Sequence, residues 1–393
     1  MNFQLTKEQE KVRELVRKFA LAEVEPIAAD IDKEHRFPKE NVEKMAQLGM
    51  MGVPFPAIYE RRERGKDPVS YPIGGAGADH ICYAITVEEL ARVCASTAVI
   101  VSAHTSLCCW PIYEYGTDEQ RKKYLPDLLS GKKLGAFGLT EPNAGTDASG
   151  QQTKAVDMGD HWLLNGAKVF ITNGGYADTF VVFAMTDKSK GNHGISAFIV
   201  EKGFKGFSIG KTEDKLGIHA SSTTELIFED CVVPKENLLG EVGKGFKIAM
   251  STLDGGRIGI ASQALGIAQG ALDVTVDYMK SRKQFGKSLD KFQALAFEVA
   301  EMKTRIEAAR LLVYKAAFLK DQHKPYGPAA AMAKYYAAET AMYVTTKAVQ
   351  LHCGYGYTTD YPVERMMRDA KITEIYEGTT EVQKMVISAS VFK

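Results

Sequence analysis

Apolar residues near the start of the chain recur with the spacing of an amphipathic helix. Those between residues 12 and 19 follow the i, i+3, i+4, i+7 rule, and Thr6-x-x-Gln9 just before them has the form of a capping box. Similar patterns predict further helices over residues 39–48, 81–94 and 98–115. The first 130 residues are therefore predicted to be mainly helical.

The pattern changes near Leu134. Short runs rich in Val, Ile, Phe and Thr now alternate with Gly, Asn and Asp; they cover residues 162–164, 168–171, 180–184, 195–200 and 225–228. Short strands at this spacing, separated by turn residues, are typical of an all-β sandwich or barrel. We expect this region to extend to about Pro234.

After Gly245 the pattern is helical again and stays so. One seam of apolar residues advances in steps of four and three: Leu295, Val299, Met302, Ile306, Ala309, Val313 and Ala316. Such a seam is typical of a helix bundle, and an Ala-rich segment over residues 329–349 predicts another long helix. The pattern therefore predicts an α+β chain of several domains: 1–130 helical, 131–240 β, and 241–393 a helix bundle.

Composition excludes several classes of protein. The 393 residues carry 49 Lys and Arg and 49 Asp and Glu, so no basic field is available to hold a nucleic acid. No run of 18 apolar residues predicts a membrane span, and the first residues lack a secretory or transit pattern. The six cysteines form no CxxC pair and have no metal-ligand spacing. We expect a bacterial cytoplasmic protein; a mitochondrial matrix protein that has lost its transit peptide remains the alternative.

One segment, Glu60 to Pro68, is a dense run of charges between two apolar, glycine-punctuated stretches. It is predicted to be an exposed, mobile loop, because it offers almost no apolar surface to bury.

The strongest candidate for chemistry is Glu377, in the sequence Ile-Tyr-Glu-Gly-Thr-Thr. It lies between an amphipathic segment that opens at Pro362 and a last helix for which Thr380-x-x-Gln383 predicts a capping box. Gly378 supplies the backbone freedom for the turn. These residues alone leave two interpretations open: a solvated corner between two helices, or a carboxylate aimed at a ligand.

Common nucleotide and hydrolase motifs do not occur: there is no Rossmann or P-loop glycine pattern, no G-x-S-x-G and no H-E-x-x-H. Instead, turns with exposed backbone N–H groups and polar side chains follow two β runs, at residues 138–147 and 168–175, and polar, glycine-containing segments interrupt the bundle at 282–287 and 350–356. One bound planar, phosphate-bearing ligand would account for these interruptions.

Five separated motifs together resemble the acyl-CoA dehydrogenase family over essentially the whole chain. They are GLTEPNAGTD, KVFITNGG, SRKQFGK, YPVERMMRDAK and IYEGTTEVQ, in the family's order and spacing, and the segment 102–108 is most similar to the short-chain, butyryl-CoA type. The resemblance implies an N-terminal helical domain, a middle β-barrel and a C-terminal four-helix bundle. It also implies FAD as cofactor, an acyl-CoA substrate, electron-transfer flavoprotein as partner, and a homotetramer that binds neither nucleic acid nor membrane.

The resemblance assigns roles residue by residue. Glu377 matches the catalytic base. Residues matching contacts to the FAD of the same subunit are Phe137, Leu139, Thr140, Gly145, Thr146, Phe170, Thr172, Thr379 and Glu381. Residues matching contacts to the neighbour's FAD are Arg282, Phe285, Gln293, Gln350 and Gly354. Residues matching substrate contacts are Thr146, Asp254, Arg257, Tyr376 and Gly378. Some relatives place the base beside Arg257, but here that neighbour is Gly256.

Three departures from the family pattern stand out: Cys353 in place of a glycine, His219 in place of an arginine, and an apparent insertion over residues 60–73. The expected reaction removes the α-proton of an acyl thioester and passes the β-hydride to FAD, with the reverse reduction using the same groups. An oxygen-using acyl-CoA oxidase, an enoyl-CoA reductase in an electron-bifurcating complex, and a non-enzymatic scaffold remain as alternatives, and Glu377 argues against the last.

Overall fold

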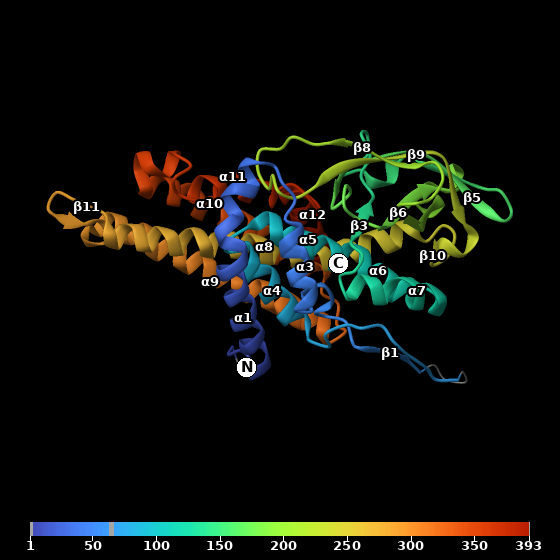
Figure 1. The fold of residues 1–393 in the computed structure, drawn as a ribbon, viewed down its shortest axis with the longest axis horizontal. Helices are drawn as coiled ribbons and strands as arrows, with labels where there is room; N and C mark the ends of the chain where they lie inside the picture. The colour runs from blue at the N-terminus through green and yellow to red at the C-terminus, as the bar shows by residue number, and fades with distance from the viewer. Residues whose placement is uncertain (1–2, 63–66, 393) are drawn as a thin grey trace.

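The computed structural model describes residues 3–62 and 67–392, which form a helical region, a sheet and a long helix bundle in that order along the chain. In Figure 1 the sheet lies at the right, and the bundle extends to the left until the hairpin β11–β12. The order agrees with the sequence pattern, and the bundle spans most of the length of the molecule.

Short helices make up the first region. They are α1 (Lys7–Phe19), α2 (Ala28–Lys33), α3 (Lys39–Gln47), α4 (His80–Ala91), α5 (Ala95–Ala103), α6 (Trp110–Tyr115) and α7 (Asp118–Leu129). The predicted capping box is confirmed: the Thr6 hydroxyl accepts from the Gln9 N–H at 3.2 Å, and the Gln9 side chain accepts from the Thr6 N–H at 2.9 Å. The predicted helix over 98–115 lies within a longer helical stretch, in which a π-helix at His104–Cys109 joins α5 to α6.

This continuous helical stretch, Ala95–Tyr115, has the length and mean hydropathy (1.2) of a membrane span. However, 94% of its apolar window is buried inside the protein. Its apolar character is therefore explained by burial in the core of a globular protein.

The middle region is one eight-stranded mixed sheet. Its strands are β3 (Gly135–Gly138), β4 (Lys154–Asp157), β5 (His161–Thr172), β6 (Thr179–Met185), β7 (Ile195–Glu201), β8 (Phe207–Thr212), β9 (Thr223–Pro234) and β10 (Leu238–Leu239). The order is β10-β7-β6-β4-β5-β9-β8, and β3 and the start of β4 pair with β6 in parallel. The two predicted runs at 162–164 and 168–171 lie in the single strand β5, whose register with β9 shifts between Lys168 and Ile171.

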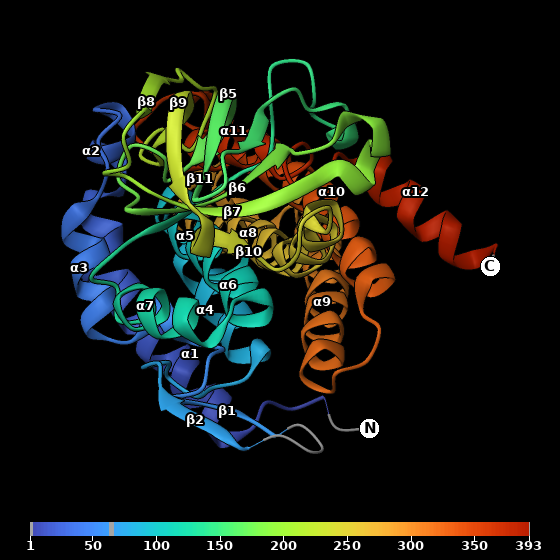
Figure 2. The same ribbon diagram turned by 90° about the vertical axis from the view of Figure 1, so that its right-hand side faces the viewer.

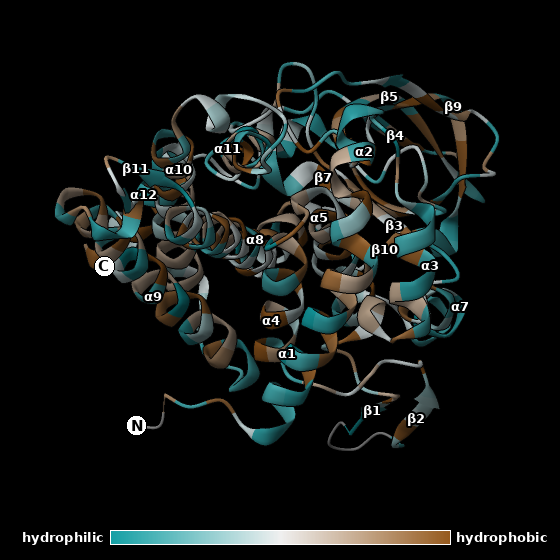
Figure 3. Ribbon diagram, turned by 60° about the vertical axis from the view of Figure 1, so that its left-hand side comes forward, coloured by the Kyte–Doolittle hydropathy of each residue, from teal (hydrophilic) through white to brown (hydrophobic). Residues whose placement is uncertain are grey.

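The last region is built on three long helices, α8 (Gly245–Ser281), α9 (Gln293–Asp321) and α10 (Gly327–His352), with α11 (Val363–Ile372) and α12 (Thr380–Val391) packed against them. A small hairpin, β11 (Lys283–Gln284) and β12 (Lys287–Ser288), joins α8 to α9. The predicted seam is confirmed: from Met302 to Ala316 its five residues are fully buried. Figures 2 and 3 show α8 at the centre, with helices from several parts of the chain around it, and in Figure 3 hydrophilic and hydrophobic residues alternate along these helices.

The predicted capping box at the last helix is wrong by one residue. The cap is Thr379, whose hydroxyl accepts from the Val382 N–H, and Thr380 is already inside α12. Gln383 does not reach back to the cap; its side-chain amide donates to the carbonyl oxygens of Glu377 and Gly378. Gln383 forms no capping box because its side-chain amide is hydrogen-bonded to the turn before the helix.

The described ends of the charged segment Glu60–Pro68 are largely exposed, as predicted, but the segment is not simply a loop. Its flanks form a hairpin, β1 (Ile58–Arg61) and β2 (Val69–Pro72), in which Tyr59 stacks on Tyr71 with ring centroids 5.2 Å apart. The Tyr71 hydroxyl donates to Asp118 of α7 at 3.0 Å. Paired tyrosines anchor this hairpin, so a prediction based on charge alone missed two strands; residues 63–66 lie outside the described part of the chain.

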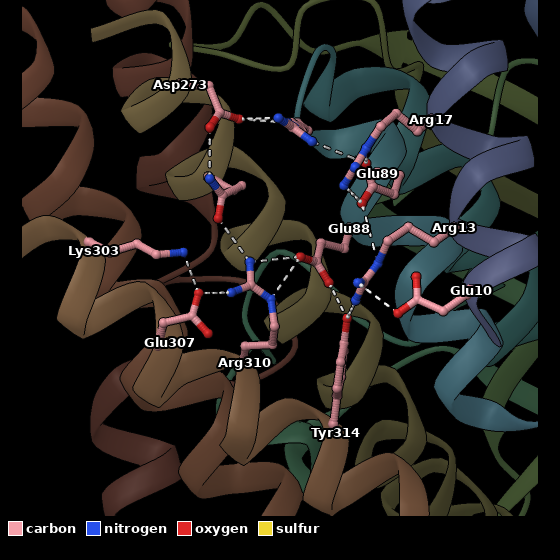
Figure 4. Close-up of polar contacts among 12 residues, drawn as sticks. Glu10, Arg13, Arg17, Glu88, Glu89, Asp273, Lys303, Glu307, Arg310 and Tyr314 are labelled. Atoms are coloured by element: carbon pink, nitrogen blue, oxygen red, sulfur yellow. Dashed lines mark hydrogen bonds and ion pairs between the residues drawn. The ribbon is translucent and has the colours of Figure 1, made fainter. Parts of the chain in front are cut away.

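A buried polar network ties α9 to α4 (Figure 4). Glu88 accepts a hydrogen bond from Arg310 at 3.0 Å and one from the Tyr314 hydroxyl at 2.7 Å, and beside it Glu89 pairs with Arg17 of α1 at 2.6 Å. A buried carboxylate without such partners would destabilise the fold strongly. The network therefore fixes the N-terminal helices in one position against the bundle that carries the candidate site.

Candidate active site

Glu377 lies on a tight turn between α11 and α12. Its backbone is in the left-handed region with φ of 54°, and Gly378 follows with φ of 96°. A left-handed conformation is uncommon for a residue with a side chain and costs about 1–3 kcal/mol, so surrounding contacts must hold it. The turn directs the glutamate side chain into the protein, toward α8.

The Oε2 atom of Glu377 is buried and has no hydrogen-bond partner among the described residues, although the residue as a whole is half-buried. Burial disfavours the charged form and raises the pKa of Glu377 to about 7, while the positive charges of Lys334 and Arg257 act in the opposite direction. A carboxyl group with this pKa ionises near neutral pH and has a free oxygen. It is suited to accept a proton from a ligand.

Glycines on α8 make room for this carboxylate. A Cβ atom at Gly256 would overlap Oε2 of Glu377 and lie 2.8 Å from Leu107 of the π-helix. One turn later, a Cβ at Gly259 would meet Tyr83 at 2.6 Å. The π-helix and α4 therefore pack closely against α8 beside Glu377.

Polar groups on α8 face the same turn. The Tyr376 hydroxyl hydrogen-bonds to Gln263, and Arg257 donates to Asp254 at 2.6 Å. The Nε of Arg257 is buried without a partner within the described chain, and burial raises the pKa of Asp254. The structure thus brings Arg257, Tyr376 and Gly378 to the neighbourhood of Glu377, with Asp254 bound to Arg257.

A second group of predicted residues follows strand β3. Phe137 lies on the strand, and Leu139, Thr140, Gly145 and Thr146 lie on the loop after it, of which Gly145 and Thr146 are exposed. A buried ion pair between Lys168 and Glu141 stabilises this loop. Lys168 of β5 donates to the carboxylate of Glu141 at 2.7 Å and to the Leu139 carbonyl at 3.1 Å.

The end of β5 presents the remaining predicted pair. Phe170 has φ of 60° and its side chain is 63% exposed, which is unusual for a phenylalanine and leaves the ring free to pack on a ligand. Thr172 ends the strand, and the next residue, Asn173, donates to the carbonyls of Ile100 at 3.1 Å and Gly135 at 3.2 Å. Asn173 thereby joins the ends of β5 and β3 to α5, which leads into the π-helix bearing Leu107.

The other predicted residues lie elsewhere. Arg282, Phe285, Gln293, Gln350 and Gly354 are exposed at the far end of the bundle. At 1.5 Å per helical residue, Arg282 is roughly 37 Å along α8 from Arg257, so it cannot reach the Glu377 site of its own chain. Arg282 and Gly354 line a pocket of about 390 Å³ there, and Phe285 is 92% exposed. Nearer to Glu377, Thr379 caps α12 and Glu381 is exposed in its first turn.

The two departures from the family pattern have plain structural settings. His219 stacks on His35 with ring centroids 4.1 Å apart, and its Nδ1 lies 3.4 Å from the Asp32 carboxylate. Cys353 takes a left-handed backbone conformation with φ of 55°, which a glycine adopts without strain, and its thiol is exposed.

Sequence reasoning missed three residues of the site: Lys334, Gln383 and Lys168. Lys334 and Lys168 are fully buried lysines. The sequence pattern that could have identified each of them is a single lysine inside an otherwise apolar segment. Gln383 was assigned to a capping box, although its amide holds the carbonyl groups of the Glu377 turn.

Comparison with known proteins gives a consistent result over the whole chain. Three family models match: the acyl-CoA dehydrogenase N-terminal domain at residues 6–132, the middle domain at 136–231 and the C-terminal domain at 243–392. A relative from Clostridium acetobutylicum described as a short-chain specific acyl-CoA dehydrogenase is 65% identical over 393 residues, covering 100% of both chains.

Two solved structures match equally completely. The butyryl-CoA dehydrogenase from Megasphaera elsdenii is 53% identical, with a TM-score of 0.95 and 100% of both chains covered. A structure described under the electron transferring flavoprotein of Acidaminococcus fermentans and flavin-based electron bifurcation is 56% identical, also with a TM-score of 0.95 and full coverage of both chains.

Proposed function

Because the chain belongs to the acyl-CoA dehydrogenase family, we propose that it converts a short-chain acyl-CoA thioester to the trans-2-enoyl-CoA with FAD as cofactor. The reverse reduction uses the same groups. The observation that carries the proposal is the Glu377 carboxyl group, which has a buried oxygen without a partner among the described residues and a pKa raised to about 7. A solvated corner residue would not have these properties.

Glu377 acts as the base. Its carboxylate takes the α-proton of the thioester as the C–H bond breaks, and the electron pair left behind forms the new double bond as the β-hydrogen leaves. FAD, when bound, supplies the acceptor for that hydrogen as a hydride. Tuning a glutamate to a pKa near the working pH maximises its efficiency as a base.

The backbone of the same residue stabilises the charge that develops on the thioester oxygen. The Glu377 N–H donates no hydrogen bond within residues 3–62 and 67–392, so it is available to a substrate carbonyl. A preorganised donor of this kind is worth roughly 2.7–4 kcal/mol in other enzymes. One residue would therefore hold the carbonyl oxygen and remove the neighbouring proton.

The residues on the sheet side fit a flavin. The exposed ring of Phe170 offers an apolar face, and Thr140 and Thr172 offer hydroxyl groups beside it, on segments that hydrogen-bond each other through the Val169 N–H and Thr140 carbonyl at 2.9 Å. We assign to the cofactor Phe137, Leu139, Thr140, Gly145, Thr146, Phe170, Thr172, Thr379 and Glu381. Asp254, Arg257, Tyr376 and Gly378, with Thr146, are assigned to the acyl-CoA.

A short acyl chain fits the space in front of Glu377. Leu107 and Tyr83 approach α8 closely at Gly256 and Gly259. Each methylene that fits a pocket contributes about 0.8 kcal/mol, whereas overfilling costs about 1–3 kcal/mol. A closely bounded pocket therefore favours an acyl chain near four carbons, in agreement with the short-chain relative.

The remaining assignments concern partners and organisation. We propose that electrons are exchanged with an electron-transfer flavoprotein in the bacterial cytoplasm, and that the functional form is a homotetramer. Arg282, Phe285, Gln293, Gln350 and Gly354 then meet the FAD of a neighbouring subunit. This arrangement explains why such residues occur about 37 Å of helix away from the base of their own chain. The domains would be 1–130, 131–240 and 241–393.

Glu377→Gln tests the proposal, because glutamine keeps the shape and removes the proton acceptor. We expect the variant to bind FAD and butyryl-CoA but to lose its flavin absorbance, on mixing with butyryl-CoA, at least about 10²-fold more slowly than the wild type. Stopped-flow absorbance measures the rate, and a titration with a non-reactive acyl-CoA measures binding. Reduction at the wild-type rate would place the base elsewhere.

A further inference from the structure

Lys334, on α10, is fully buried, although lysine is almost never found without solvent access. Its Nζ donates a hydrogen bond of 2.7 Å to the carbonyl oxygen of Gly378, the residue after Glu377. Burial lowers the pKa of Lys334 to about 8, and the nearby Glu377 acts against this shift. A buried ammonium group is costly unless it is paired, so its place beside the turn calls for an explanation.

The Gly378 carbonyl is held from two sides. Gln383 of α12 donates to it at 2.8 Å and to the Glu377 carbonyl at 3.3 Å, while Lys334 approaches from α10. Both residues of the turn have positive φ angles. The Gly378 carbonyl therefore accepts from donors on two different helices. These two hydrogen bonds stabilise the left-handed backbone conformation of Glu377, which is unfavourable for a residue with a side chain.

Charge around Glu377 comes from few sources. Lys334 acts from α10 and Arg257 from α8, and Asp254 binds Arg257 and thereby offsets part of its charge. The remaining neighbours are neutral hydroxyl groups, Tyr83 on α4 and Tyr376 on the turn itself, whose pKa values burial raises. On α12, Glu381 is exposed to solvent. Lys334 is therefore the main cation without a carboxylate hydrogen-bonded to it near Glu377.

We infer that Lys334 is a positioning residue for the catalytic step: its ammonium group fixes the Gly378 carbonyl, and its positive charge keeps the Glu377 carboxyl group ionised. The inference rests on the proposed function, because it assigns Lys334 a role through Glu377. It also explains how a carboxyl group whose Oε2 is buried and unpartnered among the described residues retains a useful charged form near neutral pH.

The test uses the holoenzyme and acetyl-CoA, which has α-hydrogens but no β-carbon. Exchange of its α-hydrogens with deuterium from solvent, followed by mass spectrometry, measures proton removal by the base without hydride transfer. The exchange rate is recorded against pH for the wild type, Lys334→Met, Lys334→Gln and Lys334→Arg. Lys384→Met, which removes an exposed lysine from α12, is the matched control.

We expect the acidic limb of the profile to move to higher pH in Lys334→Met and Lys334→Gln by about one unit or more, the usual effect of losing a neighbouring opposite charge. At pH values below the limb, exchange then falls about tenfold per unit. Lys334→Arg should restore the limb, and Lys384→Met should leave it in place. A purely structural lysine would lower the plateau without moving the limb.

An unmoved limb in Lys334→Met would overturn the inference, and so would a limb restored by the neutral donor in Lys334→Gln. If the methionine variant fails to fold, the glutamine and arginine variants still decide between a charge and a donor alone. Glu377→Gln separates this inference from the proposed function. Wild-type exchange that survives this substitution would refute the base itself, whereas exchange that needs Glu377 but ignores Lys334 refutes the inference alone.

Discussion

The two ionisable groups closest to the proposed chemistry are both held in conditions that oppose their charge. Burial raises the pKa of Glu377 to about 7 and lowers that of Lys334 to about 8. The charged form of each group would be more stable in water. Burying both groups therefore lowers the free energy of unfolding, and interactions elsewhere in the fold must offset this loss. This cost is measurable as a dependence of stability on pH.

We predict that Glu377→Gln gains stability relative to the wild type as pH rises. A carboxyl group with a higher pKa in the folded than in the unfolded protein binds more protons when folded, so the wild type loses stability between about pH 4.5 and 7. The variant lacks this loss, and its advantage above pH 7 should approach roughly 3 kcal/mol at most, less whatever Lys334 loses without its partner.

Chemical unfolding of the holoenzyme at pH 5 and pH 8 measures this difference. Glu43→Gln, at an exposed glutamate of α3, is the control and should show the same stability relative to wild type at both pH values. An advantage of Glu377→Gln that is equal at both pH values would mean that the pKa of Glu377 is not raised by folding.

At the scale of elements, periodic patterns predicted the structure well, and local polar signals did so less reliably. The seam from Met302 to Ala316 is buried as expected, because burial of one helix face depends on spacing alone. The predicted capping box at Thr380 was wrong, because the Gln383 side chain donates instead to the Gly378 carbonyl of the preceding turn. The conformation of that turn cannot be read from the local sequence. Likewise, no local pattern reveals that Lys334 contacts Gly378, 44 positions later in the chain.

The hairpin β1–β2 shows the same limit and supports a prediction of its own. Ile73, just after β2, is fully buried in the core that also contains Tyr59 and Tyr71. Ile73→Ala should therefore cost about 2–5 kcal/mol of unfolding free energy. Arg61→Ala, which removes a partly exposed ion pair with Asp118, should cost no more than about 1 kcal/mol. Thermal unfolding of both variants measures the contrast; equal, small losses would mean that the hairpin is not part of the core.

For the whole molecule, the separation of the predicted cofactor residues is the main feature. Glu377 lies on the turn between α11 and α12 and Phe170 lies near the end of β5, whereas Arg282 and Phe285 lie at the β11–β12 hairpin, which is at the far left of Figure 1. Under the proposed function, Phe170, Arg282 and Phe285 all contact FAD, although the two sets lie too far apart to meet one cofactor within a single chain. We propose that a second copy of the chain contributes its hairpin end, and closed symmetry would make this exchange reciprocal.

The exchange can be tested by mixing two inactive variants in one oligomer. Arg282→Ala impairs the hairpin end of the bundle, called the arm below, and leaves Glu377 intact. Glu377→Gln impairs the base and leaves the arm intact. If the site combines the base of one subunit with the arm of its neighbour, a mixed pair contains one complete site and one doubly defective site. Co-expression with two different affinity tags isolates the mixed oligomers.

With random pairing of equal amounts, about a quarter of all sites should be complete before the tags are used, and a larger share in the doubly tagged oligomers, so activity should recover well above that of either variant alone. The readout is turnover of butyryl-CoA together with FAD content, each per subunit. A mixture of the two separately purified variants, without exchange of subunits, is the control and should stay inactive. If the co-expressed oligomers show no more activity than this control, Arg282 and Glu377 serve a site within one chain, or Arg282 does not contact the cofactor at all.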